Sequence, residues 1–133
     1  MILKNLVTNT SLSLSHDLRW IDEHSWSKVV SNAQYSIAGA LIIESAVKQA
    51  GRFITLQHPE PEMAWHTRDI LDQLLAWASV PDLQMQLTLD DGRMFVVVFR
   101  HQESPVIESE PVTGIASSDP DSWWRFTLKL MEI

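Results

Sequence analysis

The five histidines are the side chains with the clearest chemical potential in this sequence, because imidazole binds metals and transfers protons near neutral pH. His16 and His24 are separated by eight positions, with Asp17, Asp22 and Glu23 between them. This arrangement permits a metal site, but it matches no ligand spacing typical of zinc or non-haem iron sites. We therefore interpret the histidines as ordinary surface residues. A metal-dependent hydrolase is an alternative that requires His16 and His24 to converge with acidic side chains.

Other signatures of catalysis are weak or missing in the sequence. His58 and His66 flank a proline-broken loop, and no serine near them stands in a nucleophile-elbow context. The four glycines are isolated, so no phosphate-binding loop is indicated, and the absence of cysteine excludes thiol nucleophiles and cysteine-based zinc sites. The acidic residues between 103 and 121 lack the spacing of a calcium loop. The sequence predicts neither a catalytic site nor a metal or cofactor site.

Charge and length exclude further classes of function. Seventeen acidic and ten basic residues give a formal charge of −7, which argues against a phosphate-binding surface and against nucleic acid as a partner. The 133 residues suit one domain that buries about two-thirds of its unfolded surface. No run of about twenty apolar residues and no signal-peptide pattern is found. We expect no membrane span, and assembly in the cytoplasm.

A β-hairpin is predicted most clearly at 83–100, LQMQLTLDDGRMFVVVFR. Apolar and polar residues alternate up to Asp91-Gly92, a pair suited to a two-residue turn with positive φ. With that loop, Asp90 faces Arg93, and the pair helps to fix the register rather than to catalyse a reaction. The same register pairs Leu89 with Met94, Leu87 with Val96 and Met85 with Val98.

The second strand of this hairpin is apolar on both faces. Phe95, Val97 and Phe99 lie opposite the face that carries Met94 and Val96. A strand of this kind is typical of a central position with cover on both sides. We expect Phe95 and Phe99 to be covered by the rest of this chain or by a neighbouring subunit.

One helix is predicted at about 67–79. Thr67 is placed to cap its first turn, Asp69 suits the helix dipole, and Pro81 ends it. Its apolar stripe is wide enough to lie across a sheet. The residues of the stripe are Ile70, Leu71, Leu74, Leu75 and Ala78.

The segment 34–49 has two competing periods, but its aromatic and β-branched content favours one strand with a bulge at Gly39. Gly51 then supplies a turn, and 52–57 returns as the antiparallel partner in a second hairpin. Read instead at helical spacing, Ala40, Ile43, Val47 and Ala50 share a face.

The end of the chain is predicted to be a strand at 123–133. Its apolar face consists of Trp124, Phe126, Leu128 and Leu130. Arg125 and Lys129 point outward, where charges discourage pairing at a sheet edge. A short edge strand is expected at 106–110 and an exposed loop at 113–122.

Together these elements predict an α+β fold in which an antiparallel sheet, or a partial β-barrel, packs against the helix at about 67–79. The domain is expected to span 34–133, with the β-hairpin at 83–100 and the C-terminal strand at 123–133. Residues 1–33 contain short alternations separated by polar clusters. They are predicted to form short strands or an assembly arm.

Six tryptophans are many for a chain of this length, and tryptophan is favoured at the centres of protein interfaces. A small core can also bury some of them. The side chains predicted to form a partner interface are Trp20, Trp26, Trp123, Trp124, Phe95 and Phe99.

Three pieces of the sequence carry a family resemblance. GRFITL at 51–56, LTLDDGRMFVVVF at 87–99 and the closing FTLKLMEI, with a Trp-containing helix between the first two, are similar to small tail-tip and baseplate proteins of tailed bacteriophages, particularly distal-tail proteins. The resemblance covers roughly 28–133. The chain lacks the added carbohydrate-binding-like domain of the longer distal-tail proteins.

The resemblance implies a non-enzymatic structural subunit, located in the tail of the virion, that forms or decorates a ring at the end of the tail tube. Such rings are commonly sixfold. The implied partners are further copies of the chain and other tail proteins: tube, tape measure, and hub or adaptor. A small-molecule or peptide-binding β-barrel module is the alternative, and it would be a monomer with an apolar pocket.

Overall fold

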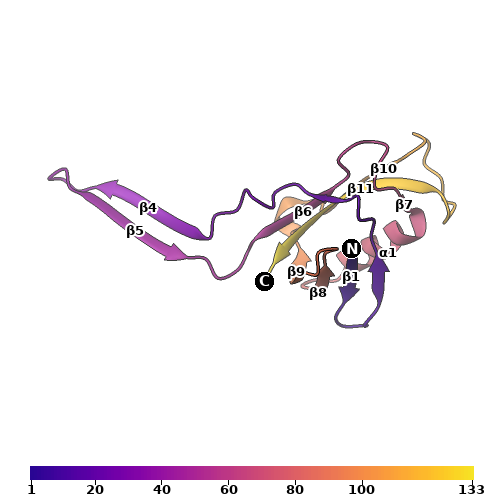
Figure 1. Cartoon of the computed structure of the whole chain (residues 1–133), viewed down its shortest axis with the longest axis horizontal. Coiled ribbons are helices and arrows are strands. Elements are labelled where there is room, and N and C mark those ends of the chain that lie inside the picture. The colour runs from indigo at the N-terminus through magenta and orange to yellow at the C-terminus, as the bar shows by residue number, and fades with distance from the viewer.

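The fold is described for every residue, 1–133, by a computed structural model. It consists of a body, which is a nine-stranded antiparallel sheet with one α-helix, and a two-stranded hairpin that projects from this body (Figure 1). The predicted α+β class, with an antiparallel sheet and one packed helix, is confirmed. The sheet has two free ends and does not close into a barrel.

The elements in chain order are β1 (Ile2–Asn5), β2 (Ser11–Ser13), β3 (Arg19–Trp20), β4 (Val29–Tyr35), β5 (Leu41–Val47), β6 (Phe53–Gln57), β7 (His66–Thr67), α1 (Arg68–Ala78), β8 (Met85–Thr88), β9 (Met94–Phe99), a 3-10 turn (His101–Glu103), β10 (Ile107–Pro111) and β11 (Trp123–Glu132). The main sheet has the order β2-β1-β8-β9-β11-β6-β3, and β7 and β10 also pair with β11. Strands β4 and β5 pair only with each other.

The C-terminal strand β11 is the centre of the sheet. Its Leu130 pairs with Ile54 of β6 on one side and with Phe99 of β9 on the other. The predicted alternation is confirmed, because Trp124, Phe126, Leu128 and Leu130 are buried. The expectation that this strand lies at an edge is wrong. Arg125 and Lys129 do not guard an edge, but form ion pairs of 3.0 Å with Glu110 and Glu108 of β10.

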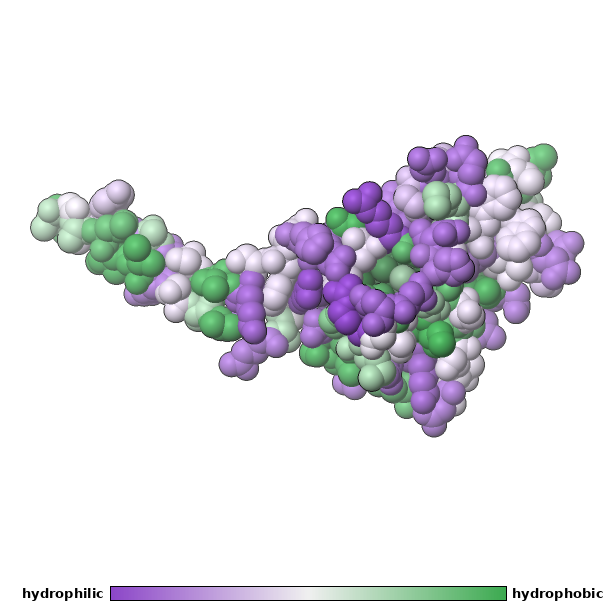
Figure 2. Space-filling model, in the orientation of Figure 1, coloured by the Kyte–Doolittle hydropathy of each residue, from purple (hydrophilic) through white to green (hydrophobic).

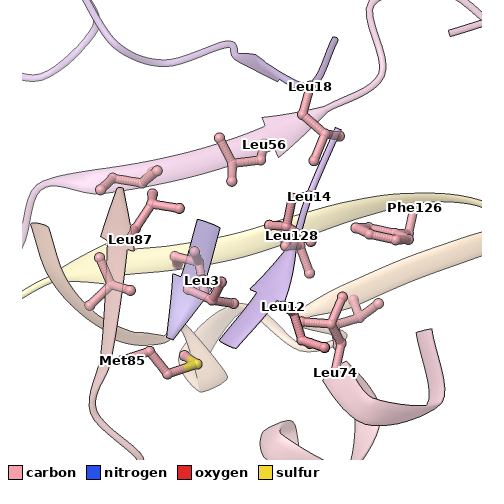
Figure 3. Packing of buried hydrophobic residues seen from close by; sticks show 14 of the residues in the cluster. Leu3, Leu12, Leu14, Leu18, Leu56, Leu74, Met85, Leu87, Phe126 and Leu128 are labelled. Atoms are coloured by element: carbon pink, nitrogen blue, oxygen red, sulfur yellow. The ribbon is translucent and has the colours of Figure 1, made fainter. Parts of the chain in front are cut away.

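The core collects side chains from both ends of the chain against the helix (Figure 3). Helix α1 confirms the predicted position and buries Leu71, Leu74 and Trp77, whereas Leu75 of the predicted stripe is exposed. Thr67 stands at the N-cap position but makes no side-chain capping hydrogen bond. Since these side chains meet Phe126 and the leucines of the sheet in one cluster, the helix packs on the face of the sheet that forms the core.

The first twenty residues belong to the body. Strand β1 lies between β2 and β8, and its Leu3 is fully buried. The chain then crosses from β2 at one end of the sheet to β3 at the other, burying Leu14 and Leu18 on the way (Figure 3). The boundary expected between residues 33 and 34 falls inside β4, so the part that stands apart from the body is β4–β5 rather than 1–33.

The hairpin at 83–100 exists, but its predicted register is wrong by one residue. The loop holds three residues, not two: Leu89 N–H donates to the Arg93 carbonyl at 2.9 Å, and Gly92 has φ +92°. Met85 therefore faces Val97, and Leu87 faces Phe95. A slip of one residue exchanges the two faces of a strand.

This exchange changes which side chains of β9 need a cover. Val97 and Phe99 point into the core and Phe95 packs against it, while Met94 and Val96 are exposed on the outer face. The expected Asp90–Arg93 pair does not form, because Asp90 accepts from the Met1 amine at 2.6 Å. The outer face of β9 is left uncovered by this chain.

The single strand expected at 34–49 is not found, because this segment contains the end of β4, a turn and β5. Gly39 is part of the turn between β4 and β5, with φ +83°, and is not a bulge. The segment 52–57 contains β6, which pairs with β11 and β3 and makes no hairpin with its predecessor. Strand β10 confirms the short edge strand expected at 106–110.

Candidate assembly surface on the projecting hairpin

The hairpin of β4 and β5, residues 29–47, carries apolar side chains that the core of the chain does not explain, and we call it the arm. It reaches away from the body into solvent (Figure 1). Its seven paired positions run from Val29 opposite Val47 to Tyr35 opposite Leu41. The turn is closed by hydrogen bonds from Ser36 N–H to the Ala40 carbonyl at 2.8 Å and from Ala40 N–H to the Ser36 hydroxyl at 3.1 Å.

Every residue of both arm strands is exposed. Figure 2 shows hydrophobic surface along much of the arm, away from the body. Two strands joined only to each other are marginally stable at best in water, because neither face is buried. Apolar surface in such a place marks an interaction site more often than a structural necessity of the monomer.

The two faces of the arm differ in character. Because side chains alternate along a strand and the pairing is antiparallel, the odd-numbered residues of both strands share one face. That face, called here the apolar face, carries no charge and consists of Val29, Ser31, Ala33, Tyr35, Leu41, Ile43, Ser45 and Val47. The other face is more polar and consists of Val30, Asn32, Gln34, Ile42, Glu44 and Ala46.

The root of the arm is fixed to the body by cations stacked on aromatic rings. The Arg52 guanidinium lies 4.5 Å from the Trp20 ring centre and 5.8 Å from that of Trp26, and the Lys48 ammonium lies 5.4 Å from the Trp26 ring. Arg52 also donates to the Glu23 carbonyl at 2.7 Å. These contacts link the residues at the root of the arm to Trp20 of the body.

The six side chains predicted to form a partner interface have different positions. Trp20, Trp124 and Phe99 are buried in the core cluster of the chain. Phe95 packs edge-on against Trp20, with ring centres 5.5 Å apart, and Trp26 is half-buried at the root of the arm. Trp123 keeps about half of its surface exposed, at 51%.

The apolar face of the arm was not among the predicted interface residues, although a signal was present. Counted at a period of two, Tyr35, Leu41, Ile43 and Val47 fall on one face of 34–49, and in the structure these residues do share a face. The missing inference was that Gly39 marks a turn. With a turn there, the segment preceding residue 34 becomes the partner strand.

The titratable side chains form no group typical of a metal site. No group of three or more His, Asp or Glu side chains is placed to hold a metal ion. His16 and His24 are exposed, and His24 lies beside Glu23 at 3.9 Å. Arg93 bridges Glu23 and Asp91 at 2.7 Å each, and hydrogen bonds from Arg93, foremost from its backbone N–H, lower the pKa of Asp91.

His66 is the one histidine within the core. Its Nε2 accepts from the Ser15 N–H at 2.8 Å, so Nδ1 carries the proton and donates to the Ala64 carbonyl at 3.1 Å. Burial lowers its pKa to about 4, against a smaller raising effect of the Ala64 hydrogen bond. The ring stacks on Phe126 at 4.4 Å and ties the crossing segment to β7, which is a structural role.

Comparisons with protein-family models, with curated proteins and with solved structures found no match. The single α-helix, at eleven residues, is too short to cross a membrane. The resemblance to phage tail-tip proteins therefore stays a prediction from sequence.

Proposed function

We propose that the protein is a non-enzymatic structural subunit of a bacteriophage tail tip or baseplate, which forms or decorates a ring at the end of the tail tube and is built into it through the arm. The observation that carries the proposal is the apolar face of the arm, which is exposed to solvent on a hairpin whose strands pair only with each other. The sequence resemblance is the reason for proposing a phage tail as the assembly. The neighbours are then tube, tape-measure, and hub or adaptor proteins of the tail.

The energetics support an assembled state for the arm. Its apolar face has five large side chains, Val29, Tyr35, Leu41, Ile43 and Val47, each exposed by between 51% and 76%. Covering the exposed half of each stabilises by about 1 kcal/mol, or about 5 kcal/mol together. That gain offsets part of the entropy lost on association, and a free arm does not obtain it.

The surface cavities favour a structural subunit over the alternative, a small-molecule or peptide-binding module. A cavity of about 330 Å³ beside β10 and β11 is lined by polar side chains alone, among them His58, Glu108 and Arg125. Another, of about 300 Å³ at the root of the arm, combines Trp26 and Phe95 with basic side chains. Binding sites for small apolar ligands are mostly apolar and enclosed, which neither of these is.

Removing the arm tests the proposal. The Lys48 N–H donates to the Lys28 carbonyl at 2.7 Å, so residues 29–47 can be replaced by Asn-Gly, which closes a two-residue turn. We expect this variant to fold with a melting temperature close to that of the full chain in its monomeric state, because the arm is not part of the core. It should fail to join tail particles when it replaces the full chain in cells that produce them.

Antibodies against the chain provide the readout on intact particles. Gold-labelled antibody is expected at the tail end of virions carrying the full chain and is expected to be lost with the arm-deleted chain. Full-length protein that folds but is never found on tail particles would contradict the proposal. Equal labelling with and without the arm would contradict the role of the arm.

A further inference from the structure

A second uncovered apolar surface lies on the body, on the outer face of the main sheet. We call it the outer patch: Ile2, Phe53, Met94, Val96, Val98, Met131 and Ile133. Strand pairing places these residues on one face. Met131 pairs with Val98 and with Phe53, and Thr88 pairs with Ile2 and with Met94. The Ile133 N–H donates to the Val96 carbonyl at 3.0 Å. The core lies on the opposite side of these strands.

The seven side chains of the outer patch are themselves uncharged, and charged residues stand at its margin. The neutral residues Gln86 and Thr88 lie between its members, and Lys4 stands at one margin. At another margin the Arg100 guanidinium lies 4.3 Å from the Phe53 ring centre and is paired with Asp22 and Glu103. Five of its members are exposed, by between 38% for Phe53 and 63% for Met94. Both faces of β9 are apolar in sequence, yet the chain covers only the face that carries Val97 and Phe99.

We propose that the apolar face of the arm docks on the outer patch of a second copy of this chain, so that copies join head to tail. This rests on the proposed assembly role and names the partner of the arm. The arm does not lie on its own outer patch, because it projects away from the body and its strands pair only with each other (Figure 1). In such an assembly each chain uses the apolar face of its arm once and its outer patch once.

The dimensions and charges of the two faces agree. From Val29 to Tyr35 the arm is about 20 Å long at about 3.4 Å per residue. The outer patch crosses five neighbouring strands, β1, β8, β9, β11 and β6, which is about 19 Å at about 4.8 Å per strand. Copies that each carry a charge of −7 repel one another, so an interface between them favours uncharged faces, and Glu44 of the arm points away from the apolar face.

A contact between two different surfaces of the same chain is heterologous, and it closes into a ring when the rotation between copies allows. Pairing of two arms through their apolar faces would be isologous and would leave the outer patch exposed. A different tail protein on the outer patch would leave the purified chain monomeric. These are the two outcomes that the experiment must separate from head-to-tail assembly.

The absence of cysteine allows the contact to be mapped directly. Ile43→Cys lies in the middle of the apolar face of the arm, Val96→Cys lies in the outer patch, and Ile42→Cys is a matched control on the other arm face. Under mild oxidation, a mixture of the I43C and V96C chains should give dimers joined between positions 43 and 96, identified by peptide mass spectrometry. Ile42→Cys should give several-fold fewer. Predominant 43–43 dimers, or no dimers, would overturn the proposal.

Charged substitutions give an independent reading by light scattering after gel filtration. The unmodified chain should form a closed oligomer, whereas I43E and V96E should each be monomeric and I42E should behave as unmodified. Mixing I43E with V96E restores one intact arm and one intact patch, so a dimer and nothing larger is expected. An unmodified chain that stays monomeric, or V96E chains that still assemble, would overturn head-to-tail docking.

The two proposals fail separately. If the unmodified chain is monomeric but still reaches the tail in an arm-dependent way, the tail role stands and the self-contact is wrong. If the chain forms head-to-tail oligomers but never appears on tail particles, the self-contact stands and the tail role is wrong. Circular dichroism of each variant verifies folding, and since positions 42, 43 and 96 are exposed, no change is expected.

Discussion

Two β-hairpins rich in aliphatic residues, β8–β9 and β4–β5, can be compared, and only the first packs on the core of the chain. Both carry large aliphatic side chains on each strand, and both turn at a glycine with positive φ. In β8–β9, one face packs on the core, where Met85, Leu87 and Val97 are fully buried. In β4–β5, every strand residue is exposed. Alternation therefore indicates a face that needs cover, but not whether this chain or another supplies it.

The largest expected difference between the hairpins is in the cost of removing a leucine. Leu87→Ala in β8 should lower the free energy of unfolding by about 2–5 kcal/mol, because it deletes fully buried methyl groups and leaves a cavity. Leu41→Ala in the arm removes the same atoms from a half-exposed site, so the cost in the monomer should stay within about 0.5 kcal/mol. Urea unfolding of both variants, made in the arm-bearing monomer V96E, measures the contrast.

A cost above about 2 kcal/mol for Leu41→Ala in a verified monomer would mean that the arm packs on the body in solution. The comparison between covered and uncovered hairpins would then be wrong. A cost below about 1 kcal/mol for Leu87→Ala would mean that the core relaxes around the deletion. Leu74→Asp is a harsher test of the same core and is expected to unfold the body.

Sensitivity to acid should belong to the body and not to the arm. The pKa of His66 is lowered to about 4, so the folded protein holds this ring neutral while the unfolded chain protonates it near 6.5. The stability that neutral His66 supplies is complete above pH 6.5 and is lost as the pH falls towards 4. Between pH 7 and pH 5 this loss is about 2 kcal/mol.

His66→Gln isolates that contribution, because glutamine can still accept from the Ser15 N–H but does not titrate. The variant is expected to lose about 2 kcal/mol less than the unmodified protein between the two pH values, by urea unfolding followed with tryptophan fluorescence. The arm has one titratable carboxylate, Glu44, and the tyrosine, so its deletion should leave the difference between pH 7 and pH 5 unchanged. An equal loss of stability in the H66Q variant between pH 7 and pH 5 would mean that other groups cause the effect.

Periodicity in the sequence was sufficient to predict the helix, the apolar face of β11 and the existence of the hairpin at 83–100. These are properties of single segments, because burial of one face follows from spacing within the segment. Asp91-Gly92 suggested a two-residue turn, whereas the folded chain uses a three-residue loop that includes Asp90. That one residue reversed the predicted faces of β9, since register depends on loop length.

The central position of β11 and the separation of the arm were beyond prediction from spacing. Which strands flank β11 is decided by long-range packing. Nothing within 123–133 distinguishes an edge strand from a central one, because polar residues alternate with the buried apolar ones. The arm was missed because Gly39 fits both a bulge and a turn. The choice depends on the segment 29–33, whose partner is not visible from its own composition.

The smallest expected effect concerns the two turn glycines. Gly92 and Gly39 both have positive φ, at +92° and +83°, and an added Cβ would meet no atom within 4 Å at either position. Alanine at each should therefore cost about 1 kcal/mol locally, from backbone strain alone. Gly92→Ala should lower the free energy of unfolding of the whole body by that amount, because β8 and β9 unfold with the core.

Gly39→Ala should instead leave global unfolding of the monomer nearly unchanged, because the arm turn is not coupled to the core. Its cost should appear as faster hydrogen exchange, by about fivefold, at the Ala40 amide, which donates to Ser36. In the assembled protein the same substitution should lower the global stability as well, since docking couples the arm to a second core. Equal effects of Gly39→Ala on monomer and oligomer would show that the arm stays uncoupled after assembly, and that its apolar face is not the surface that docks.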